Sequence, residues 1–356
     1  MINNWKIIQA FILLLLSTTI LSAQDLEDLS FGTDNSLDIA TWNIEWFPKN
    51  GQTTVEYVTQ ILQQLDLDVL AMQELDNKDM FDEMLDALPA YTGYYESAWF
   101  AGLAYIYKTE YVEINNIYEI YTTSPYWSAF PRSPMVMDMN FMGENYFLIN
   151  NHFKCCGDGI LDFNNESDEE KRRYNAANLL KEYIDTNLSN KNVLVLGDLN
   201  DDIAESSQNN VFQMILDDPD NYLFVDFEIA TGSISDWSYP TWPSHLDHIL
   251  ITNELFDEID DFDVQTTKVD EYLDNGWYEY DYNISDHRPV AVKFNFNPNI
   301  NGDINGDGIL NIQDIIVIIT MVLDGDYSTV ADMNGDETIN ILDVVLVAFI
   351  ILNPEP

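Results

Sequence analysis

The chain has 356 residues, of which 46% are hydrophobic and 13% aromatic, so it can bury a core and is not intrinsically disordered. Its length allows one large domain and a small one, since single domains rarely exceed roughly 250–300 residues. The formal net charge of −48 excludes a protein that coats nucleic acid through a basic face. A phosphate ester can still be reached through a bound divalent cation, because the ion inverts the local field.

Residues 1–23 have the pattern of a secretory signal peptide. Lys6 precedes an apolar run at residues 7–16, and small residues follow up to Ala23. The run is too short to be expected to span a membrane, and no second run of spanning length occurs in the sequence. We therefore expect a secreted protein without a transmembrane segment.

Apolar runs and helical stripes alternate along the first half of the chain. We expect strands at residues 38–44, 67–72, 103–107, 111–120, 135–141, 146–150, 193–196 and 245–251 and within 285–294, and helices at 53–65, 78–88, 168–185 and 208–216. Gly197 is expected to turn the backbone sharply at the end of one strand. The later strands come without helices between them, which predicts an α/β protein with two packed sheets and helices outside.

Acidic, amide and histidine side chains gather where these strands end. They are Asn43, Glu74, His152, Asp198, Asn200, Asp247, Asp286 and His287. Phosphodiester hydrolysis needs a hard cation on a carboxylate, an oriented water and groups that stabilise the developing charge. It also needs an acid for the leaving oxygen, and histidine suits that role near neutral pH. The set holds every type, whereas His245 and His248, among apolar neighbours, are expected to be buried structural residues.

Six stretches occur in the order and spacing of the endonuclease/exonuclease/phosphatase superfamily: TWNIEWF, AMQEL, NNHFK, GDLND, HLDHIL and SDHRPV. The chain resembles this superfamily over residues 37–296. The resemblance implies the deoxyribonuclease I-like fold, a four-layer α/β/β/α sandwich, and a hydrolase of phosphoric esters that uses Mg²⁺ or Mn²⁺.

The resemblance also implies roles for the polar residues. Glu74 would be the main metal ligand, helped by Asn43 and Asp286. Asp198 would orient or activate the attacking water, and Asn200 would hold the phosphate.

Two histidines complete the set that the resemblance implies. Asp247 would pair with His287 and set its tautomer, while His287 binds or protonates the phosphoryl group. His152 would be the second histidine, as general acid or phosphate ligand, and it favours the secreted nucleases, sphingomyelinases and inositol phosphatases over the abasic-site repair branch. Glu96 is the nearest candidate for an acidic partner of His152.

The C-terminal residues 301–356 follow an expected linker at 297–300, contain no Lys or Arg and hold an internal repeat. DINGDGILNIQD at 303–314 recurs as DMNGDETINILD at 332–343, with oxygen side chains at calcium-loop positions 1, 3, 5, 9 and 12. The repeat resembles a type I dockerin, a small all-α module that holds two Ca²⁺ ions. The ligands implied are Asp303, Asn305, Asp307, Ile309, Asn311 and Asp314, then Asp332, Asn334, Asp336, Thr338, Asn340 and Asp343, with Ile309 and Thr338 contributing backbone carbonyls. Dockerins bind cohesin modules, so a scaffold or cell-surface partner is a hypothesis.

The two cysteines, Cys155 and Cys156, are adjacent in sequence and receive no catalytic role. In the loop at residues 125–134, the side chains of Trp127, Phe130 and Arg132 could contact substrate, although core packing explains the aromatics equally well.

The interpretation that follows is a secreted, metal-dependent phosphodiesterase, first of all a DNA or RNA endonuclease, carried on a calcium-binding docking module. Two alternatives stay open. One is a phosphoesterase of the same fold that acts on a phospholipid headgroup or a small phosphate ester, which the acidic surface favours. The other is a non-catalytic, calcium-dependent scaffold or binding protein.

Overall fold

The computed structural model describes residues 25–33, 36–97, 100–256, 262–295, 301–305, 310–336 and 338–353. The expected signal peptide, the expected linker at 297–300 and the expected calcium ligands Asp307 and Ile309 lie outside these residues. Among the described helices, none is long and apolar enough to cross a membrane.

Twelve strands lie in two six-stranded sheets within the described residues. The first sheet has the order β11-β12-β1-β2-β4-β3 and the second the order β5-β6-β7-β8-β10-β9. The strands are β1 (Ser36–Phe47), β2 (Val69–Leu75), β3 (Tyr91–Tyr94), β4 (Gly102–Lys108), β5 (Val112–Glu119), β6 (Met135–Phe141), β7 (Glu144–His152), β8 (Asn192–Asp198), β9 (Tyr222–Phe224), β10 (Asp247–Thr252), β11 (Phe262–Thr266) and β12 (Val290–Asn295). The helices are α1 (Gln52–Leu65), α2 (Lys78–Asp86), α3 (Glu169–Asn187), α4 (Gln213–Leu216), α5 (Phe227–Ala230), α6 (Gly276–Asn283), α7 (Ile312–Asp324) and α8 (Ile341–Leu352).

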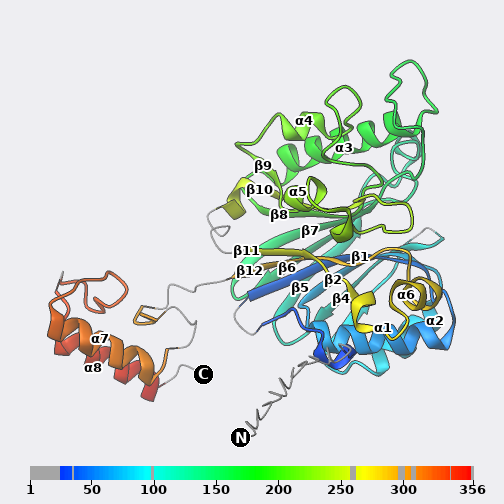
Figure 1. The fold of residues 1–356 in the computed structure, drawn as a ribbon. Coiled ribbons are helices and arrows are strands. Elements are labelled where there is room, and N and C mark those ends of the chain that lie inside the picture. Colours follow the sequence, from blue (N-terminus) through cyan, green and yellow to red (C-terminus); the bar gives the residue numbers. More distant parts are fainter. Residues whose placement is uncertain are drawn as a thin grey trace, which may run out of the picture.

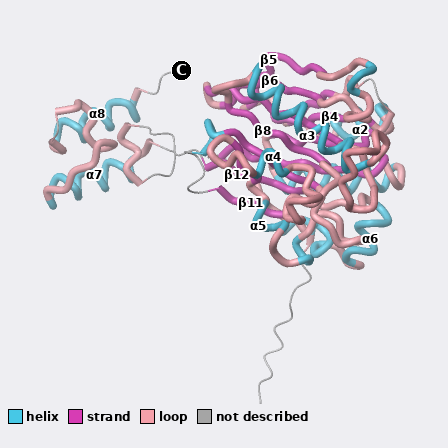
Figure 2. Tube along the Cα trace, turned by 90° about the horizontal axis from the view of Figure 1, so that it is seen from above, coloured by secondary structure: helices cyan, strands magenta, loops and turns pink. Residues whose placement is uncertain are grey.

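The two sheets pack face to face and carry helices on their outer faces. Alternation along β1 sends Leu37 and Ile39 into the core between the sheets, and Ala40 and Trp42 into the core under α1. The second sheet uses β8 in the same way, with Leu194 and Leu196 facing the first sheet and its other face covered by α3. Figure 1 shows α1, α2 and α6 on one side of the strands and α3, α4 and α5 on the other, and Figure 2, seen from above, shows α3 and α4 lying over the strands. The expected arrangement of two sheets flanked by helices is confirmed.

Buried polar side chains join the two sheets just beneath the edge that carries the candidate site. Gln73 Nε2 on β2 donates to Asn150 Oδ1 on β7 at 2.8 Å and to Thr41 Oγ1 at 3.0 Å. Tyr105 on β4 donates from its hydroxyl to Met135 O and Leu148 O of the second sheet and accepts the Asn150 N–H. Buried networks of this kind fix the position of one sheet on the other, so the residues next to them are held in register.

Each sheet has one parallel strand pair at its centre, and these pairs bring the polar strand ends together. β1 runs parallel to β2, and β7 runs parallel to β8. The carboxyl ends carry Asn43 and Glu74 in the first sheet, and His152 and Asp198 in the second. β10 is antiparallel to β8 and begins at Asp247, directly opposite Asp198. Ligands of α/β proteins commonly bind at such carboxyl edges.

Two expected elements differ from the structure. The helix expected at residues 208–216 is only the short α4 (Gln213–Leu216), because turns occupy the residues before it. Gly197 does not end its strand, as the expected turn required, but lies within β8 opposite Asn151. Its φ is +144°, and a Cβ there would lie 1.9 Å from Asn151 O. Glycine is therefore required by the close approach of β7 rather than by a turn.

Gly197→Ala is expected to lower the free energy of unfolding by about 3–5 kcal/mol, because the methyl group meets backbone that cannot move without breaking the β7–β8 pairing. Chemical denaturation would measure this. Gly143→Ala is the matched control, since Gly143 also has a positive φ of +89° but has open space where its Cβ would lie. Backbone strain alone should cost that variant about 1–2 kcal/mol, and equal losses in the two variants would contradict the steric explanation.

The C-terminal helices α7 and α8 form a small apolar core of their own. Ile318, Ala331, Val344 and Val347 are its buried members within the described residues. Each helix begins at an asparagine N-cap, Asn311 or Asn340, whose oxygen accepts a backbone N–H two residues later. The two helices therefore begin directly after these caps, at Ile312 and Ile341.

Candidate metal and phosphoester site

The predicted site residues line one pocket of about 540 Å³. Among its walls are seven of the eight side chains singled out in the sequence, namely Asn43, Glu74, His152, Asp198, Asn200, Asp286 and His287. The eighth, Asp247, lies directly behind His287, with Oδ2 2.7 Å from His287 Nδ1. Residues more than 240 positions apart are thus brought together by the central strands of both sheets.

Glu74 is the residue best suited to hold a divalent cation. Its Oε2 is buried and has no hydrogen-bond partner among the described residues. Its Oε1 lies 3.4 Å from Asn43 Nδ2 and 3.8 Å from His152 Nε2. Its backbone has a φ of +65°, a conformation that costs of order 1–3 kcal/mol for a non-glycine residue and is tolerated mainly at functional sites. An orphaned carboxylate oxygen among further oxygen donors fits Mg²⁺ or Mn²⁺.

Asp198 lies at the centre of the pocket, and its carboxylate is buried. Asn43 Nδ2 donates to its Oδ2 at 2.9 Å, and the Asn200 N–H donates to its Oδ1 at 3.0 Å. Burial raises the pKa of Asp198 to about 7, with Asp247 and Glu74 adding to the rise and the charge of His287 opposing it. Asn200 lies beyond the end of β8, in left-handed backbone with φ +55°, and reaches the pocket.

His287 is held by both its ring and its backbone. Its Nδ1 donates to Asp247 Oδ2, while its carbonyl oxygen accepts hydrogen bonds from Trp42 Nε1 at 3.0 Å and from the Tyr280 hydroxyl at 2.6 Å. Burial alone would lower its pKa, but the carboxylates of Asp247 and Asp198 raise the pKa of His287 to about 10. The ring is therefore a cation at neutral pH and presents its Nε2–H to the pocket, 3.9 Å from Asp198 Oδ2.

His152 has the opposite character. Its Nε2 lies 3.5 Å from Asp198 Oδ2, and its buried Nδ1 has no partner among the described residues. Burial, with the charges of Arg132 and His287, holds the pKa of His152 well below its usual range. Glu96 is exposed and makes no contact with this ring, so the expected acidic partner is wrong. A neutral imidazole favours the phosphate-ligand role over the general-acid role that the sequence left open.

Asp286 forms part of the pocket wall beside an acidic residue that the sequence analysis did not single out. Glu45 Oε2 accepts the Asp286 N–H at 2.8 Å and pairs with Lys49. Burial raises the pKa of Glu45 to about 7, Lys49 opposes the rise, and Asp286 adds to it. The pair gives one side of the pocket a second carboxylate cluster in addition to Glu74.

Seven further residues of the pocket wall were missed or dismissed in the sequence. They are Trp46, Cys155, Cys156, Tyr239, Trp242, Ser244 and Leu246. The two cysteines are exposed free thiols that follow the β7 histidine by three and four residues. Trp46 had a usable signal, because it follows Asn43 within the same motif, whereas nothing local marks Tyr239 or Trp242.

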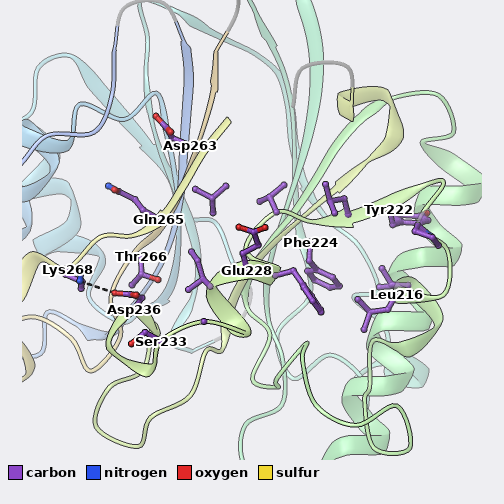
Figure 3. A pocket seen from close by; sticks show the side chains of 18 residues that line it. Leu216, Tyr222, Phe224, Glu228, Ser233, Asp236, Asp263, Gln265, Thr266 and Lys268 are labelled. Atoms are coloured by element: carbon purple, nitrogen blue, oxygen red, sulfur yellow. Dashed lines mark hydrogen bonds and ion pairs between the residues drawn. The ribbon is translucent and has the colours of Figure 1, made fainter. Parts of the chain in front are cut away.

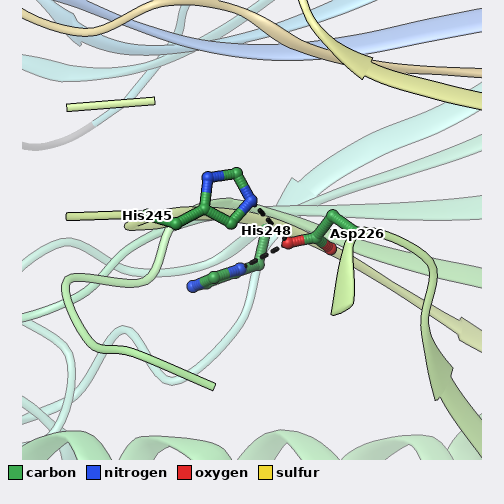
Figure 4. Close-up of side chains that lie close together, drawn as sticks. All are labelled: Asp226, His245 and His248. Atoms are coloured by element: carbon green, nitrogen blue, oxygen red, sulfur yellow. Dashed lines mark hydrogen bonds and ion pairs between the residues drawn. The ribbon is translucent and has the colours of Figure 1, made fainter. Parts of the chain in front are cut away.

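A second histidine cluster lies behind the site and is structural, as expected. His245 and His248 both bind Asp226 Oδ2, at 3.0 and 2.6 Å, and all three side chains are buried (Figure 4). His248 also donates from Nε2 to Asp201 O, so both of its nitrogens carry protons, whereas His245 Nδ1 accepts the Ser238 N–H. These contacts join the segment between β9 and β10 to the loop after β8, and each ring nitrogen of the two histidines has a protein partner.

His248→Gln is expected to lower the free energy of unfolding by about 3–5 kcal/mol, because it leaves a buried carboxylate without its cation. Asp226 raises the pKa of His248 against the effect of burial, so this stability is complete below the unfolded value near 6.5 and is lost as the pH rises through the folded value. The two histidines hold the pKa of Asp226 below its usual range despite burial. The contribution of this carboxylate to the free energy of unfolding is therefore present above about pH 4 and is lost on stronger acidification.

Urea denaturation between pH 5 and pH 9 measures this dependence. The difference between wild type and His248→Gln should be largest near pH 5–6 and shrink toward alkaline pH. His245→Gln is the matched control, and its loss should be smaller, because His245 Nδ1 accepts the Ser238 N–H and only Nε2 faces Asp226. A difference for His248→Gln that stays constant over the whole range would contradict the ion pair.

A larger groove, of about 960 Å³, lies away from the predicted residues. It runs between β9 and β11, the edge strands of the two sheets, and is lined by apolar residues such as Leu216 and Phe224. Its polar margin includes Lys268, whose Nζ lies 3.0 Å from Asp236 Oδ1 (Figure 3). None of the eight predicted catalytic residues lines it, so volume alone does not mark the chemistry.

A family model described as the Endonuclease/Exonuclease/phosphatase family matches residues 40–287. The chain belongs to this family. The match runs from within β1 to His287, just before β12, and includes every polar residue of the pocket described above. Its members are phosphoesterase hydrolases, and the match includes the residues that form the pocket at the carboxyl ends of β1, β2, β7 and β8.

Solved structures of other family members have the same fold. TDP2 from D. rerio, complexed with a single-strand DNA product, has a TM-score of 0.55 at 16% identity and covers 74% of this chain and 100% of its own. The human Nocturnin catalytic domain with a bound sulfate anion has a TM-score of 0.53 at 15% identity, covering 73% and 94%. A family member from Bacteroides vulgatus has a TM-score of 0.50 at 17% identity, covering 72% and 98%. No curated protein matches the chain.

Proposed function

We propose that the protein is a secreted, divalent-metal-dependent phosphodiesterase that hydrolyses nucleic-acid phosphodiester bonds. One observation carries the proposal: Glu74, with its unpartnered buried oxygen, lies in one pocket with Asp198 and with a cationic His287 fixed by Asp247. Carboxylates for a hard cation, a base for water and a cation for the phosphoryl oxygens are the groups that this chemistry needs. The D. rerio TDP2 complex with single-strand DNA supports a nucleic-acid substrate.

The roles follow from the positions of the side chains. Glu74, Asn43 and Asp286 would hold Mg²⁺ or Mn²⁺, which when bound polarises the phosphoryl group and offsets its charge. Asp198 orients the attacking water and accepts its proton. The Nε2–H of His287 faces the pocket and stabilises charge on the phosphoryl oxygens, while Asp247 fixes its ring. Asn200 and the neutral His152 bind the remaining phosphate oxygens through N–H donors.

The experiment is hydrolysis of four substrates, plasmid DNA, a single-stranded oligonucleotide, sphingomyelin vesicles and a phosphomonoester, in Mg²⁺ and again in EDTA. Cleavage of the nucleic acids that EDTA abolishes supports the proposal. Cleavage of sphingomyelin or the monoester alone would move the protein to a lipid or small-ester phosphoesterase, an alternative that the net charge of −48 favours. No hydrolysis under any condition would favour the non-catalytic binding protein.

The C-terminal module is proposed to be a dockerin-like calcium module that tethers the enzyme to a cohesin-type scaffold or cell-surface partner. Its two loops are built alike: Asp314 accepts the backbone N–H of Ile304 and Asn311, and Asp343 accepts those of Met333 and Asn340. The α7 stripe Ile312, Ile316, Ile319 and Leu323 remains exposed after α7 and α8 pack together. An apolar helical face of this kind suits a protein partner.

Calcium titration of the full chain tests the module. We expect two Ca²⁺ ions to bind and residues 301–353 to become more protected from hydrogen exchange, because the acidic loops lack any other cation to offset their charge. Asp303→Ala combined with Asp332→Ala should abolish the effect without changing phosphodiester hydrolysis. Protection that is the same in Ca²⁺ and EDTA would overturn the calcium assignment.

A further inference from the structure

The rim of the active-site pocket is aromatic and comes from both sheets. Trp46 extends from the end of β1, and its ring lies against Phe100 with centroids 5.2 Å apart. Tyr239 and Trp242 come from the loop that precedes β10, and the Tyr239 ring lies 4.7 Å from the His287 ring. The exposed fractions are 47% for Trp46, 72% for Phe100 and 76% for Trp242. Large apolar rings left this exposed do not contribute to the core and mark a binding surface.

The backbone under Trp46 is strained. Glu45 and Trp46 have φ values of +44° and +55°, and the pairing of β1 with β2 shifts between Asn43 and Phe47. Two consecutive left-handed residues that are not glycine cost of order 1–3 kcal/mol each. The strain turns Glu45 toward Asp286 and leaves Trp46 in the pocket wall, which is an arrangement that folding alone would not favour.

The pocket has almost no cation with which to bind a chain of phosphates. None of the residues that line it is Lys or Arg. The nearby cations within the described part of the chain already have partners. Lys49 pairs with Glu45, and Arg173 pairs with Asp201. Arg132 donates from Nε to Ala101 O, and Lys154 donates from Nζ to Cys155 O. Binding that neutralises many phosphates would need several free cations. The rings are therefore the main source of affinity outside the reacting phosphate.

We propose that Trp46 and Trp242 stack on the bases of a single-stranded nucleic acid and so select single strands over duplexes. This inference rests on the proposed phosphodiesterase function. Aromatic side chains bind single strands by stacking, with little dependence on sequence, because every base has a π-face. The bases of a duplex already stack on each other, so a rim of this kind gains nothing from them unless the strands separate.

The test compares KM and kcat for a short single-stranded oligonucleotide, the same oligonucleotide with abasic positions around the cleaved bond, and the duplex. Trp46→Ala and Trp242→Ala should each raise KM for the single strand about 5- to 150-fold, the loss expected for about 1–3 kcal/mol per stacked base. The abasic oligonucleotide should show a similar rise with wild type and little further rise with the variants. Trp46→Phe should restore most of the affinity.

Tyr278→Ala is the control, since Tyr278 on α6 is equally exposed and stacks only on Tyr282. Its KM should stay at the wild-type value, and the wild-type KM should depend weakly on salt. Suppose that wild type cleaves single strands, that the tryptophan variants have the KM of wild type, and that the abasic oligonucleotide has the KM of the intact one. The stacking inference is then wrong, while the proposed phosphodiesterase function is still supported. Absence of any metal-dependent hydrolysis would instead refute the proposed function. If the tryptophan variants lose activity only on phosphocholine lipid in vesicles, the aromatic rim binds a lipid headgroup and the stacking inference is overturned.

Discussion

Glu74→Gln should lower kcat for phosphodiester hydrolysis by about a thousandfold while the protein stays folded. The amide keeps the shape of the side chain but removes the charge that would hold the divalent cation beside Asp198. A metal ion contributes several kcal/mol of charge stabilisation in the transition state, and each 1.36 kcal/mol corresponds to a factor of ten in rate. Initial rates at saturating Mg²⁺ measure the loss, and calorimetric titration with Mn²⁺ should show weakened binding in the same variant.

The fold of this variant should be intact and even slightly more stable without metal, because Glu74 Oε2 is buried with no partner among the described residues. Thermal unfolding in EDTA checks this point. Glu83→Gln is the matched control, since Glu83 is exposed on α2 and its removal should change neither rate nor Mn²⁺ affinity. Unchanged hydrolysis by Glu74→Gln would show that the cation lies elsewhere or that the pocket is not catalytic.

Asp247→Asn is expected to lower kcat by about a hundred- to ten-thousandfold with little change in KM. The Asp247 carboxylate both fixes the ring of His287 and stabilises its positive charge, and the comparable substitution in a catalytic triad costs about 10⁴ in kcat. An amide in its place can still accept the Nδ1–H through its oxygen, but it carries no negative charge and no longer stabilises the His287 cation.

Steady-state kinetics on the oligonucleotide substrate would separate kcat from KM. Asp236→Asn is a suitable control, because Asp236 also pairs with a cation, Lys268, but lies in the groove between β9 and β11. A large rise in KM with unchanged kcat would mean that Asp247 acts only in substrate binding. Another residue would then have to stabilise the negative charge that develops on the phosphoryl group.

The sequence predicted most of the sandwich because its signals are local. Buried strands such as β8 read as four apolar residues between polar neighbours, and α1 showed its stripe clearly. The polar strand ends were also visible, and the six motifs ordered them. The predictions that failed concern details that depend on a neighbouring strand. Gly197 was predicted to form a turn, but it lies within β8, where the backbone of Asn151 on β7 leaves no room for a Cβ.

The parts of the site that could not be predicted depend on contacts across the fold. Gln73 and Asn150 hold the sheets together across 77 positions of sequence, and no local pattern announces their hydrogen bond. The left-handed backbone at Glu45 and Trp46 has no glycine to mark it. The different characters of His152 and His287 follow from what surrounds each ring. Burial and the charges of Arg132 and His287 act on His152, whereas the carboxylates of Asp247 and Asp198 act on His287, and no local pattern shows these neighbours.

The most direct measurement is Mg²⁺-dependent hydrolysis of plasmid DNA and a single-stranded oligonucleotide by wild type and by His287→Ala. We expect wild type to cleave both substrates and EDTA to abolish the cleavage. His287→Ala should cleave them at least about a hundredfold more slowly, because the pocket would lose the cation that faces the phosphoryl group. Equal cleavage by the two proteins, or cleavage that continues in EDTA, would contradict a metal-dependent site built around Glu74, Asp198 and His287.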